Sequence, residues 1–408
     1  MKKIILFLFH LWLYVINYIS KPILLPFLLI KLNVRYKNIR ELWKMRGPYL
    51  MLPNHTNQWD PFILSIATPT PIRWVTSDAQ FREAFKTALL LAGAIPKVKE
   101  QSDMVTLQSV KEAMAFREVA GIFPEGSQNW DGHIGELIPA TAKLVRFLKV
   151  PVVVPLIQGG YISKPRWAWM NRRCRIEVEF KQIINADEIQ TLRLSEIEKR
   201  IAKALEYDDF EWQKQAMVPL RSNKRAEHLE LAHYGCPSCE GIGTFCSEGN
   251  NLTCSCGFNV YVDEYGFFKY PEDGPSFESP YEWTQWQKRH LVELFRDNLD
   301  SGEADPVLMA DSDVVLMRGE RAQPMRPVAQ GEARLYRDRI EVGPHQSAHV
   351  TIPLKEATGA NTFKQQKFEF RYEKAQYRFK FKTRHVSGYK WEMAYKGLRN
   401  LLVERGEW

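Results

Sequence analysis

The sequence predicts an α/β chain with a mostly parallel sheet flanked by helices. Apolar N-terminal helices precede this sheet, and a small cysteine-rich module and an antiparallel β domain with a C-terminal helix follow it. Three observations predict this order: a strongly apolar start, short apolar runs alternating with helix-length segments, and paired cysteines ahead of strands with aromatic residues at every second position. Because domains commonly hold roughly 100 to 200 residues, a chain of 408 residues allows two or three domains.

The N-terminus carries two apolar runs, residues 4–19 and residues 23–30, and Pro26 interrupts the second. Neither run reaches the roughly 20 residues that a bilayer-spanning helix needs. No small-residue cleavage site follows, and lysines and aromatic residues at the flanks suit headgroup depth. We expect two short membrane-anchor helices that lie in the interface. One tilted spanning helix, a cleaved signal and a buried core helix pair are the alternatives.

The next part of the chain alternates predicted strands with predicted helices. Apolar stretches that predict short buried strands are residues 49–52, 72–75, 121–123 and 150–155. Helix-length segments between and after them are residues 61–67, 105–119, 139–148 and 195–207. This alternation predicts a mostly parallel sheet that is covered on both faces. Residues 175–180 alternate polar with apolar side chains, as an edge strand does.

Charge and cysteine content limit the partners and the compartment. A net charge of +8 suits an anionic partner such as lipid headgroups, an acidic carrier protein, a phosphorylated substrate or nucleic acid. Six cysteines are too few for a disulfide scaffold in a chain of this length. Four of them cluster, which indicates metal binding in a reducing compartment and therefore a cytosolic location for the body of the protein.

The clustered cysteines form two pairs that predict a zinc ribbon. Thiolates paired on two turns are what a four-coordinate structural zinc ion needs, and the metal then substitutes for a missing core. The predicted ligands are Cys236, Cys239, Cys254 and Cys256. The second pair is spaced by one residue where two are usual, so Cys246 is an alternative fourth ligand. Two unrelated turns with free thiols are the other alternative.

The last part of the chain predicts a helix, then antiparallel strands, then a closing helix. The helices cover residues 281–295 and 389–404, and the strands cover residues 333–336, 339–342, 349–353, 368–372 and 377–381. This arrangement resembles a pleckstrin-homology or GRAM-like domain. Because residues 236–270 are not rich in Lys and Arg, nucleic acid is a disfavoured partner. We place the domains at residues 1–34, 35–215, 233–270 and 280–408.

A polar loop, residues 54–60, follows the first predicted strand and precedes a helix. A hydroxyl is too weak an acid to react unassisted near neutrality, and imidazole is the side chain best suited to remove its proton. His55 is therefore a candidate base, and Asp60 can accept a hydrogen bond from one ring nitrogen and fix the tautomer. The alternative is that Asp60 caps the helix and His55 is an ordinary loop residue.

A second motif, Phe123-Pro124-Glu125-Gly126-Ser127, stands about seventy residues downstream. Together the two motifs resemble those of the phospholipid and glycerol acyltransferase superfamily, which includes the lysophosphatidate acyltransferases. That family has four ordered blocks: His-four residues-Asp, a strand end with a basic residue, Phe-Pro-Glu-Gly-Ser/Thr, and a Val-Pro-rich strand. Residues 95–97 (Ile-Pro-Lys) stand at the second block and residues 150–155 at the fourth.

The resemblance implies that His55 is the general base, that Asp60 orients it, and that catalysis needs no cofactor. The residues that it assigns to substrate binding are Asn54, Lys97, Glu125, Gly126, Ser127 and Gln128. Lys97 is the first choice for the acceptor's phosphate, and the further candidates are Arg73, Lys99 and Lys143. The family usually has Arg where this chain has Gln128, so the identity of the acceptor stays open.

The function that this resemblance implies is acyl transfer to the hydroxyl of a lysophospholipid. The donor is acyl-CoA or acyl-carrier protein, and the first choice of reaction is 1-acylglycerol-3-phosphate to phosphatidate. The expected location is the cytoplasmic membrane, with the catalytic domain facing the cytosol. The alternative is a membrane-tethered adaptor with a vestigial acyltransferase fold, which binds a protein or lipid through the zinc ribbon and the C-terminal domain. Acyl chain length, oligomeric state and the role of the C-terminal domain do not follow from the sequence.

Overall fold

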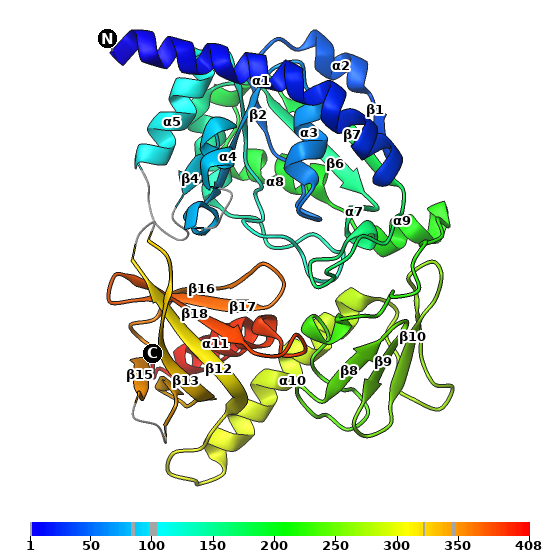
Figure 1. Ribbon diagram of the computed structural model, residues 1–408, viewed down its shortest axis with the longest axis vertical. Coiled ribbons are helices and arrows are strands. Elements are labelled where there is room, and N and C mark those ends of the chain that lie inside the picture. Colours follow the sequence, from blue (N-terminus) through cyan, green and yellow to red (C-terminus); the bar gives the residue numbers. More distant parts are fainter. Residues whose placement is uncertain (1, 83–85, 98–103, 321–322, 345–347) are drawn as a thin grey trace. The chain divides into compact units, whose positions relative to one another are not determined.

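The structure is a computed structural model that describes residues 2–82, 86–97, 104–320, 323–344 and 348–408. The chain forms two compact units (Figure 1). The first comprises Met1–Arg166 and Asn171–Arg221, and the second comprises Trp167–Met170 and Ser222–Trp408.

The first unit is built on a mixed but mostly parallel sheet, as the sequence predicts. Its strand order is β1-β7-β6-β2-β5-β3-β4. The strands are β1 (Val34–Lys37), β2 (Leu50–Met51), β3 (Ile72–Ser77), β4 (Ile95–Lys97), β5 (Val119–Gly121), β6 (Val152–Gln158) and β7 (Ile176–Ile184). β2 runs parallel to β5 and β6, and β7 runs antiparallel to β6. The expectation that residues 175–180 form an edge strand is wrong, because β1 pairs in parallel with the outer side of β7.

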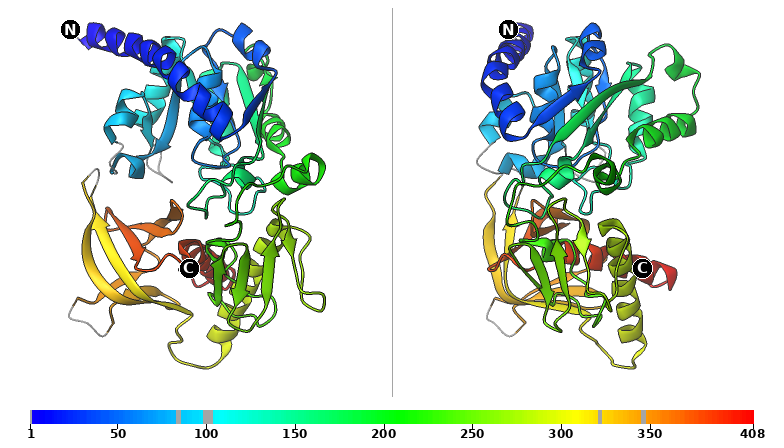
Figure 2. Two further views of the ribbon diagram at one scale, coloured as in Figure 1. Left: turned by 45° about the vertical axis from the view of Figure 1, so that its right-hand side comes forward. Right: turned by 90° about the vertical axis from the view of Figure 1, so that its right-hand side faces the viewer.

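Helices lie on both faces of this sheet (Figure 2). They are α1 (Lys2–Lys31), α2 (Ile39–Lys44), α3 (Asp60–Ala67), α4 (Lys86–Leu91), α5 (Met104–Ala115), α6 (Ala140–Leu148), α7 (Gly160–Ser163), α8 (Leu194–Leu205) and α9 (Asp209–Ala216). Successive β2 side chains serve opposite faces: Met51 packs in the cluster with Leu28 and Ile63, whereas Leu50 packs in the cluster with Ile197. Both faces of the sheet are therefore core.

The N-terminus is one helix, α1, so the expectation of two short helices is wrong. Pro22 and Pro26 lie inside α1, where each removes a backbone donor. Tertiary contacts carry the helix across them, since Leu25 and Leu28 pack in the core and Lys21 Nζ donates to the Thr68 carbonyl at 2.7 Å. Residues 4–31 are long and apolar enough to cross a membrane. The side of α1 away from the core exposes a row of large apolar residues: Ile4, Phe7, Leu8, Leu11, Val15, Ile19, Ile23 and Ile30.

The second unit contains two antiparallel sheets. The smaller has the order β11-β10-β9-β8, with β8 (Phe245–Glu248), β9 (Asn251–Cys254), β10 (Asn259–Val262) and β11 (Phe268–Lys269). The larger has the order β15-β14-β13-β12-β18-β17-β16. Its strands are β12 (Met309–Gly319), β13 (Arg326–Leu335), β14 (Arg339–Val342), β15 (Val350–Pro353), β16 (Thr358–Phe363), β17 (Lys367–Tyr372) and β18 (Ala375–Phe381). The helices of this unit are η3 (Leu229–Leu231), α10 (Pro280–Asp300) and α11 (Gly388–Glu404).

Two strands of the larger sheet, β12 and β16, do not follow from the sequence pattern. The pairing of β12 with β13 shifts register between Asp311 and Val314, so the period-two alternation of a strand is interrupted there. β16 has a similar shift next to Gly359 in its pairing with β17. The closing helix α11 is as expected, and its Trp391 packs against Phe379 with ring centroids 4.9 Å apart.

Candidate active site

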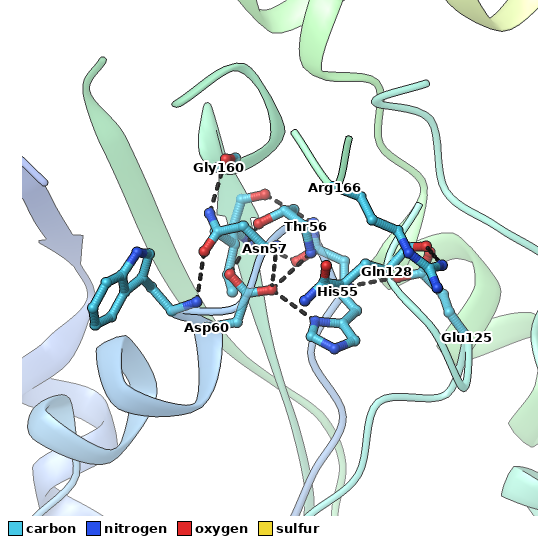
Figure 3. A network of polar contacts seen from close by, with 11 residues as sticks. His55, Thr56, Asn57, Asp60, Glu125, Gln128, Gly160 and Arg166 are labelled. Atoms are coloured by element: carbon cyan, nitrogen blue, oxygen red, sulfur yellow. Dashed lines mark hydrogen bonds and ion pairs between the residues drawn. The ribbon is translucent and has the colours of Figure 1, made fainter. Parts of the chain in front are cut away.

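The two sequence motifs meet at one edge of the first sheet. β2 and β5 are parallel neighbours, so their carboxyl ends lie at the same edge. The loop with His55 follows β2, and the turn with Glu125 follows β5. In open α/β sheets this edge is where ligands bind. Figure 3 shows the resulting network, with His55 and Asp60 side by side and Glu125 on the far side of His55.

Asp60 begins α3 and is fully buried. Its Oδ2 accepts hydrogen bonds from His55 Nδ1 at 2.9 Å and from the backbone N–H groups of Thr56 and Asn57 at 2.7 and 2.9 Å. Its Oδ1 accepts from Thr56 Oγ1 at 3.0 Å. A carboxylate is only an acceptor, so His55 Nδ1 carries the ring proton and Nε2 keeps its lone pair. The arrangement prepares Nε2 to take a proton from a substrate.

The imidazole of His55 is held between this carboxylate and an aromatic wall. The ring stacks on Phe123 with centroids 3.9 Å apart and planes at 20°. Phe123 in turn stacks on Trp74 at 5.0 Å and 16°. The side chain keeps 17% of its surface exposed, so the ring has one fixed orientation and one open side.

Glu125 connects its own turn by hydrogen bonds to the loop with His55 and to the loop with Gly135. Its Oε1 accepts from the backbone N–H of His55 at 2.6 Å and its Oε2 from that of Gly135 at 2.9 Å. Burial raises the pKa of Glu125 to about 8, against the lowering effect of these two hydrogen bonds. The turn that presents Glu125 closes by a hydrogen bond from Gly126 N–H to the Phe123 carbonyl at 3.0 Å. Gly126 has φ +69°, a conformation that favours glycine, so the motif's glycine is needed for the turn.

Asn54 joins the loop after β2 to strand β6 through both atoms of its amide. Its Nδ2 donates to the Ile157 carbonyl and its Oδ1 accepts from the Ile157 N–H, both at 2.8 Å. The residue is buried, so these two bonds fix the start of the loop that carries His55.

Asp209 supports the same loop and was not found from the sequence. It is fully buried and accepts from the backbone N–H groups of Gly159 and Ile162 at 2.5 and 3.1 Å. The Gly160 carbonyl between them accepts from Asn57 Nδ2 at 2.8 Å. Burial raises the pKa of Asp209 to about 7. No local motif marks Asp209, because its partners lie about fifty residues earlier in the chain.

A second residue that sequence reasoning missed is Arg166. Its Nη1 donates to the backbone carbonyl of Gln128 at 2.9 Å (Figure 3). Its guanidinium lies 4.5 Å from the centre of the Trp130 ring. It is 8% exposed. Arg166 therefore brings a positive charge next to Gln128 itself, the position where the resembled family usually has arginine. Ser127 lies beside Gln128 in the same bend and is half-buried.

The other basic candidates lie elsewhere. Lys97 ends β4, three strands from β2 in the sheet order, which is roughly 14 Å at the usual strand spacing. Arg73 is buried, with its Nη1 3.4 Å from Glu118 Oε2, so its charge is engaged there. Lys143 is exposed on α6. Lys99 lies outside the described residues.

The four cysteines of the second unit converge. The Sγ atoms of Cys236, Cys239, Cys254 and Cys256 all lie within 4.8 Å of one another. Cys236 and Cys256 are 3.8 Å apart and Cys239 and Cys254 3.7 Å apart, measured between Sγ atoms. Tetrahedral zinc with bonds of about 2.3 Å places its sulfur ligands about 3.8 Å apart, so the donor set fits zinc. Cys246 is not in this group.

A known protein family matches the part of the chain that carries both motifs. Residues 31–157 match the family model described as acyltransferase, and this segment contains all four of the sequence blocks described above. No curated protein matches the chain.

Among solved structures, one described as the 1-acyl-sn-glycerophosphate (LPA) acyltransferase PlsC from Thermotoga maritima is 14% identical, with a TM-score of 0.38, and the match covers 53% of this chain and 98% of that one. The Vps36 N-terminal PH domain is 14% identical with a TM-score of 0.19, covering 24% of this chain and 83% of that one. A chain of the 8S snRNP assembly intermediate is 13% identical with a TM-score of 0.19, covering 23% and 83%. The assignment of an acyltransferase domain therefore rests on the family match and on the geometry above.

Proposed function

We propose that this protein is an O-acyltransferase that moves a fatty acyl group from acyl-CoA or acyl-carrier protein to the hydroxyl of a lysophospholipid. The observation that carries the proposal is the hydrogen bond of 2.9 Å between His55 Nδ1 and Asp60, within the segment that matches the acyltransferase family. It leaves Nε2 as a base on the open side of the ring.

The reaction follows from this arrangement. The acceptor hydroxyl oxygen attacks the thioester carbonyl carbon while its proton passes to His55 Nε2, and Asp60 stabilises the imidazolium that forms. Backbone N–H groups are expected to hold the tetrahedral oxyanion. The intermediate collapses as the carbon–sulfur bond breaks, and the thiolate takes the proton back from Nε2. The products are an ester and a free thiol, and no nucleophilic side chain is needed.

A phosphate-bearing acceptor, with 1-acylglycerol-3-phosphate as the first choice, is supported by Arg166. Gln128 has no charge, but Arg166 lies 2.9 Å from its carbonyl and can supply the charge that a phosphate needs. Buried, planar and always charged, a guanidinium suits this role better than a solvated lysine.

The membrane supplies both lipids in this proposal. The exposed apolar side of α1 is the surface that would lie in the bilayer interface, with the sheet domain on the cytosolic side. In the second unit, Cys236, Cys239, Cys254 and Cys256 are proposed to hold a structural zinc ion, supported by the spacing of their sulfur atoms.

The test is acyl transfer by the full chain in detergent or membranes. Wild type should esterify lysophosphatidate with acyl-CoA or acyl-carrier protein, and His55→Ala should lower the rate by at least about a hundredfold while the chain still folds. His349→Ala is the matched control, because His349 is an exposed histidine of the second unit. A folded wild type that turns over no lyso-acceptor with either donor would contradict the proposal and favour the adaptor alternative.

A further inference from the structure

The second unit contains another cluster of ligand-type side chains besides the four cysteines. His228 directly precedes η3, Glu230 lies within η3, and His385 lies in the loop between β18 and α11. Glu230 Oε1 is 2.6 Å from His385 Nδ1 and 3.8 Å from His228 Nδ1. One ligand atom from each of the three residues lies within 4.8 Å of the other two.

Two atoms of this cluster are buried without a hydrogen-bond partner in the described part of the chain. They are His228 Nδ1 and Glu230 Oε2. His228 is 8% exposed and Glu230 3% exposed, so water does not readily compensate either residue. Leaving a polar atom unpaired in the interior is unfavourable, and such atoms in a folded protein call for a physical explanation. Imidazole nitrogens and carboxylate oxygens both bind metals, and a carboxylate can do so through either oxygen; the two histidines approach Oε1 of Glu230.

We infer that His228, Glu230 and His385 bind a divalent transition-metal ion, with zinc as the best fit. Two imidazoles and one carboxylate form a donor set that zinc accepts, and calcium and magnesium prefer oxygen ligands only. Tetrahedral nitrogen and oxygen ligands at about 2.0 to 2.1 Å from zinc lie about 3.3 Å apart. The separations of 2.6 and 3.8 Å bracket this value, and the two histidine ligand atoms lie within 4.8 Å of each other, so shifts of the side chains would form the site.

The exposure of the three ligands fits this inference. His385 keeps 48% of its side chain exposed on a loop, which lets it adjust and leaves one side of the ion for a water ligand. Glu227 Oε1 lies 4.0 Å from His228 Nε2, which is longer than a hydrogen bond, so this carboxylate would have to move about 1 Å closer to orient the ring as a metal ligand.

An ion here would cross-link two distant segments of the second unit. Glu230 and His385 are 155 residues apart in the sequence. Next to them, Ser387 Oγ donates to the Leu231 carbonyl at 2.6 Å, so the two segments already meet. The metal would tie the segment before the cysteine module to the loop that enters α11. Unlike the all-sulfur site, this site has only nitrogen and oxygen donors.

The experiment measures bound zinc in the purified full chain by elemental analysis, after incubation with zinc alone and removal of excess. We expect two zinc ions per chain for wild type and one for the His228→Ala/His385→Ala double variant. The Cys236→Ser/Cys239→Ser variant should also keep one ion, and His349→Ala, the matched control, should keep two. A histidine double variant that holds as many ions as wild type overturns the inference, whether or not the cysteine site is filled.

Two further measurements cover variants that fail to fold. Glu230→Gln changes a single atom and should also drop to one ion while its circular dichroism matches wild type; two ions in this variant would refute the site. With cobalt in place of zinc, the thiolate charge-transfer bands should persist in Glu230→Gln and the weaker visible bands of the nitrogen–oxygen site should disappear. Loss of the thiolate bands with unchanged weaker bands would equally contradict the assignment. None of these readouts depends on acyltransferase activity.

Discussion

The protein has two groups of histidine and carboxylate side chains, one with His55 and Asp60 and one with His228, Glu230 and His385. They differ in how many of their polar atoms have a hydrogen-bond partner. At the sheet edge, both oxygens of Asp60 accept hydrogen bonds from the chain, and His55 is left with one lone pair on its open side. In the second unit, one buried oxygen of Glu230 and one buried nitrogen of His228 have no hydrogen-bond partner among the residues that the structure describes. The hydrogen bonds at the first pair orient His55 for proton transfer. The missing hydrogen bonds at the second pair leave atoms that a bound ion could contact. Substituting each buried or half-buried carboxylate by its amide tests this difference.

Asp60→Asn should have the largest effect. The amide can accept from one side only, and its NH₂ group would face N–H donors of the loop, so we expect a loss of about 2 to 4 kcal/mol in the free energy of unfolding. The NH₂ group introduced at this position would also donate to His55 Nδ1, so the ring would take the tautomer with its proton on Nε2. We expect this to lower the rate of acyl transfer in the variant roughly a hundred- to ten-thousandfold. Denaturant unfolding and a lysophosphatidate assay measure the two effects. Near wild-type activity would show that Asp60 does not orient His55.

Asp209→Asn should come next, since Asp209 also accepts two backbone N–H groups. We expect a loss of about 1 to 3 kcal/mol of stability, because one donor would lose its acceptor. Asp209 accepts from the segment that contacts Asn57 and makes no hydrogen bond to His55 within the described residues, so the rate should fall less than in Asp60→Asn. Comparing the two variants in the same unfolding and activity assays makes the test. A larger loss of activity in Asp209→Asn would contradict this ordering.

Glu125→Gln should show a smaller effect that depends on pH. The folded-state pKa of Glu125, about 8, lies above its ordinary value of 4.5, so the folded chain keeps a proton that the unfolded chain releases. This contribution to wild-type stability is complete below the ordinary pKa and is lost as pH rises through about 8. Glutamine does not titrate, so the melting temperature of the variant should improve relative to wild type from about pH 5 to about pH 8.

The measurement is thermal unfolding of both proteins across that range in buffers of equal ionic strength. Leu90→Ala, an exposed residue, is a control whose difference from wild type should not vary with pH in this way. A constant difference between Glu125→Gln and wild type would show that Glu125 is ionised throughout.

Glu230→Gln in the metal-free chain should have the smallest effect. Removing a buried charge with an unpaired oxygen offsets the weakened contact to His385, so we expect a change within about 1 kcal/mol. Thermal unfolding after chelation measures it, with metal-free Asp60→Asn as the contrasting variant. A loss as large as that of Asp60→Asn would mean that the chain satisfies Glu230 by itself.

The contact between His55 and Asp60 was predictable because its geometry is local. His55 and Asp60 are five residues apart and belong to one loop, and the turn at Glu125 carries its own Pro and Gly signals. The one-residue spacing of the second cysteine pair also has a local explanation. Cys254 ends β9 and Cys256 lies in the turn that follows, so both reach the cluster. What the sequence reasoning missed comes from distant segments. Arg166 and Asp209 reach the site only through the fold, and nothing in their immediate sequence distinguishes them from ordinary surface charges.

The strand and helix errors have similar causes. The four-residue β1 is too short to show a period, yet it covers the outer side of β7 and removes an expected edge. In α1, Pro22 led us to expect a break between two helices. The helix continues through Pro22 because its later residues pack against the core. Local propensity sets an expectation for each segment, and burial against neighbours decides the outcome.

Helix α1 packs against the first unit, so it cannot be removed without exposing buried residues. His10 Nδ1 lies 2.6 Å from Glu118 Oε1, and Glu118 is fully buried beneath it. Cutting the chain after α1 to obtain a freely diffusing enzyme would uncover that carboxylate together with the pocket of Leu28. The proposed membrane attachment and the folding of the first unit thus use opposite sides of the same thirty residues, so removing the helix would remove both.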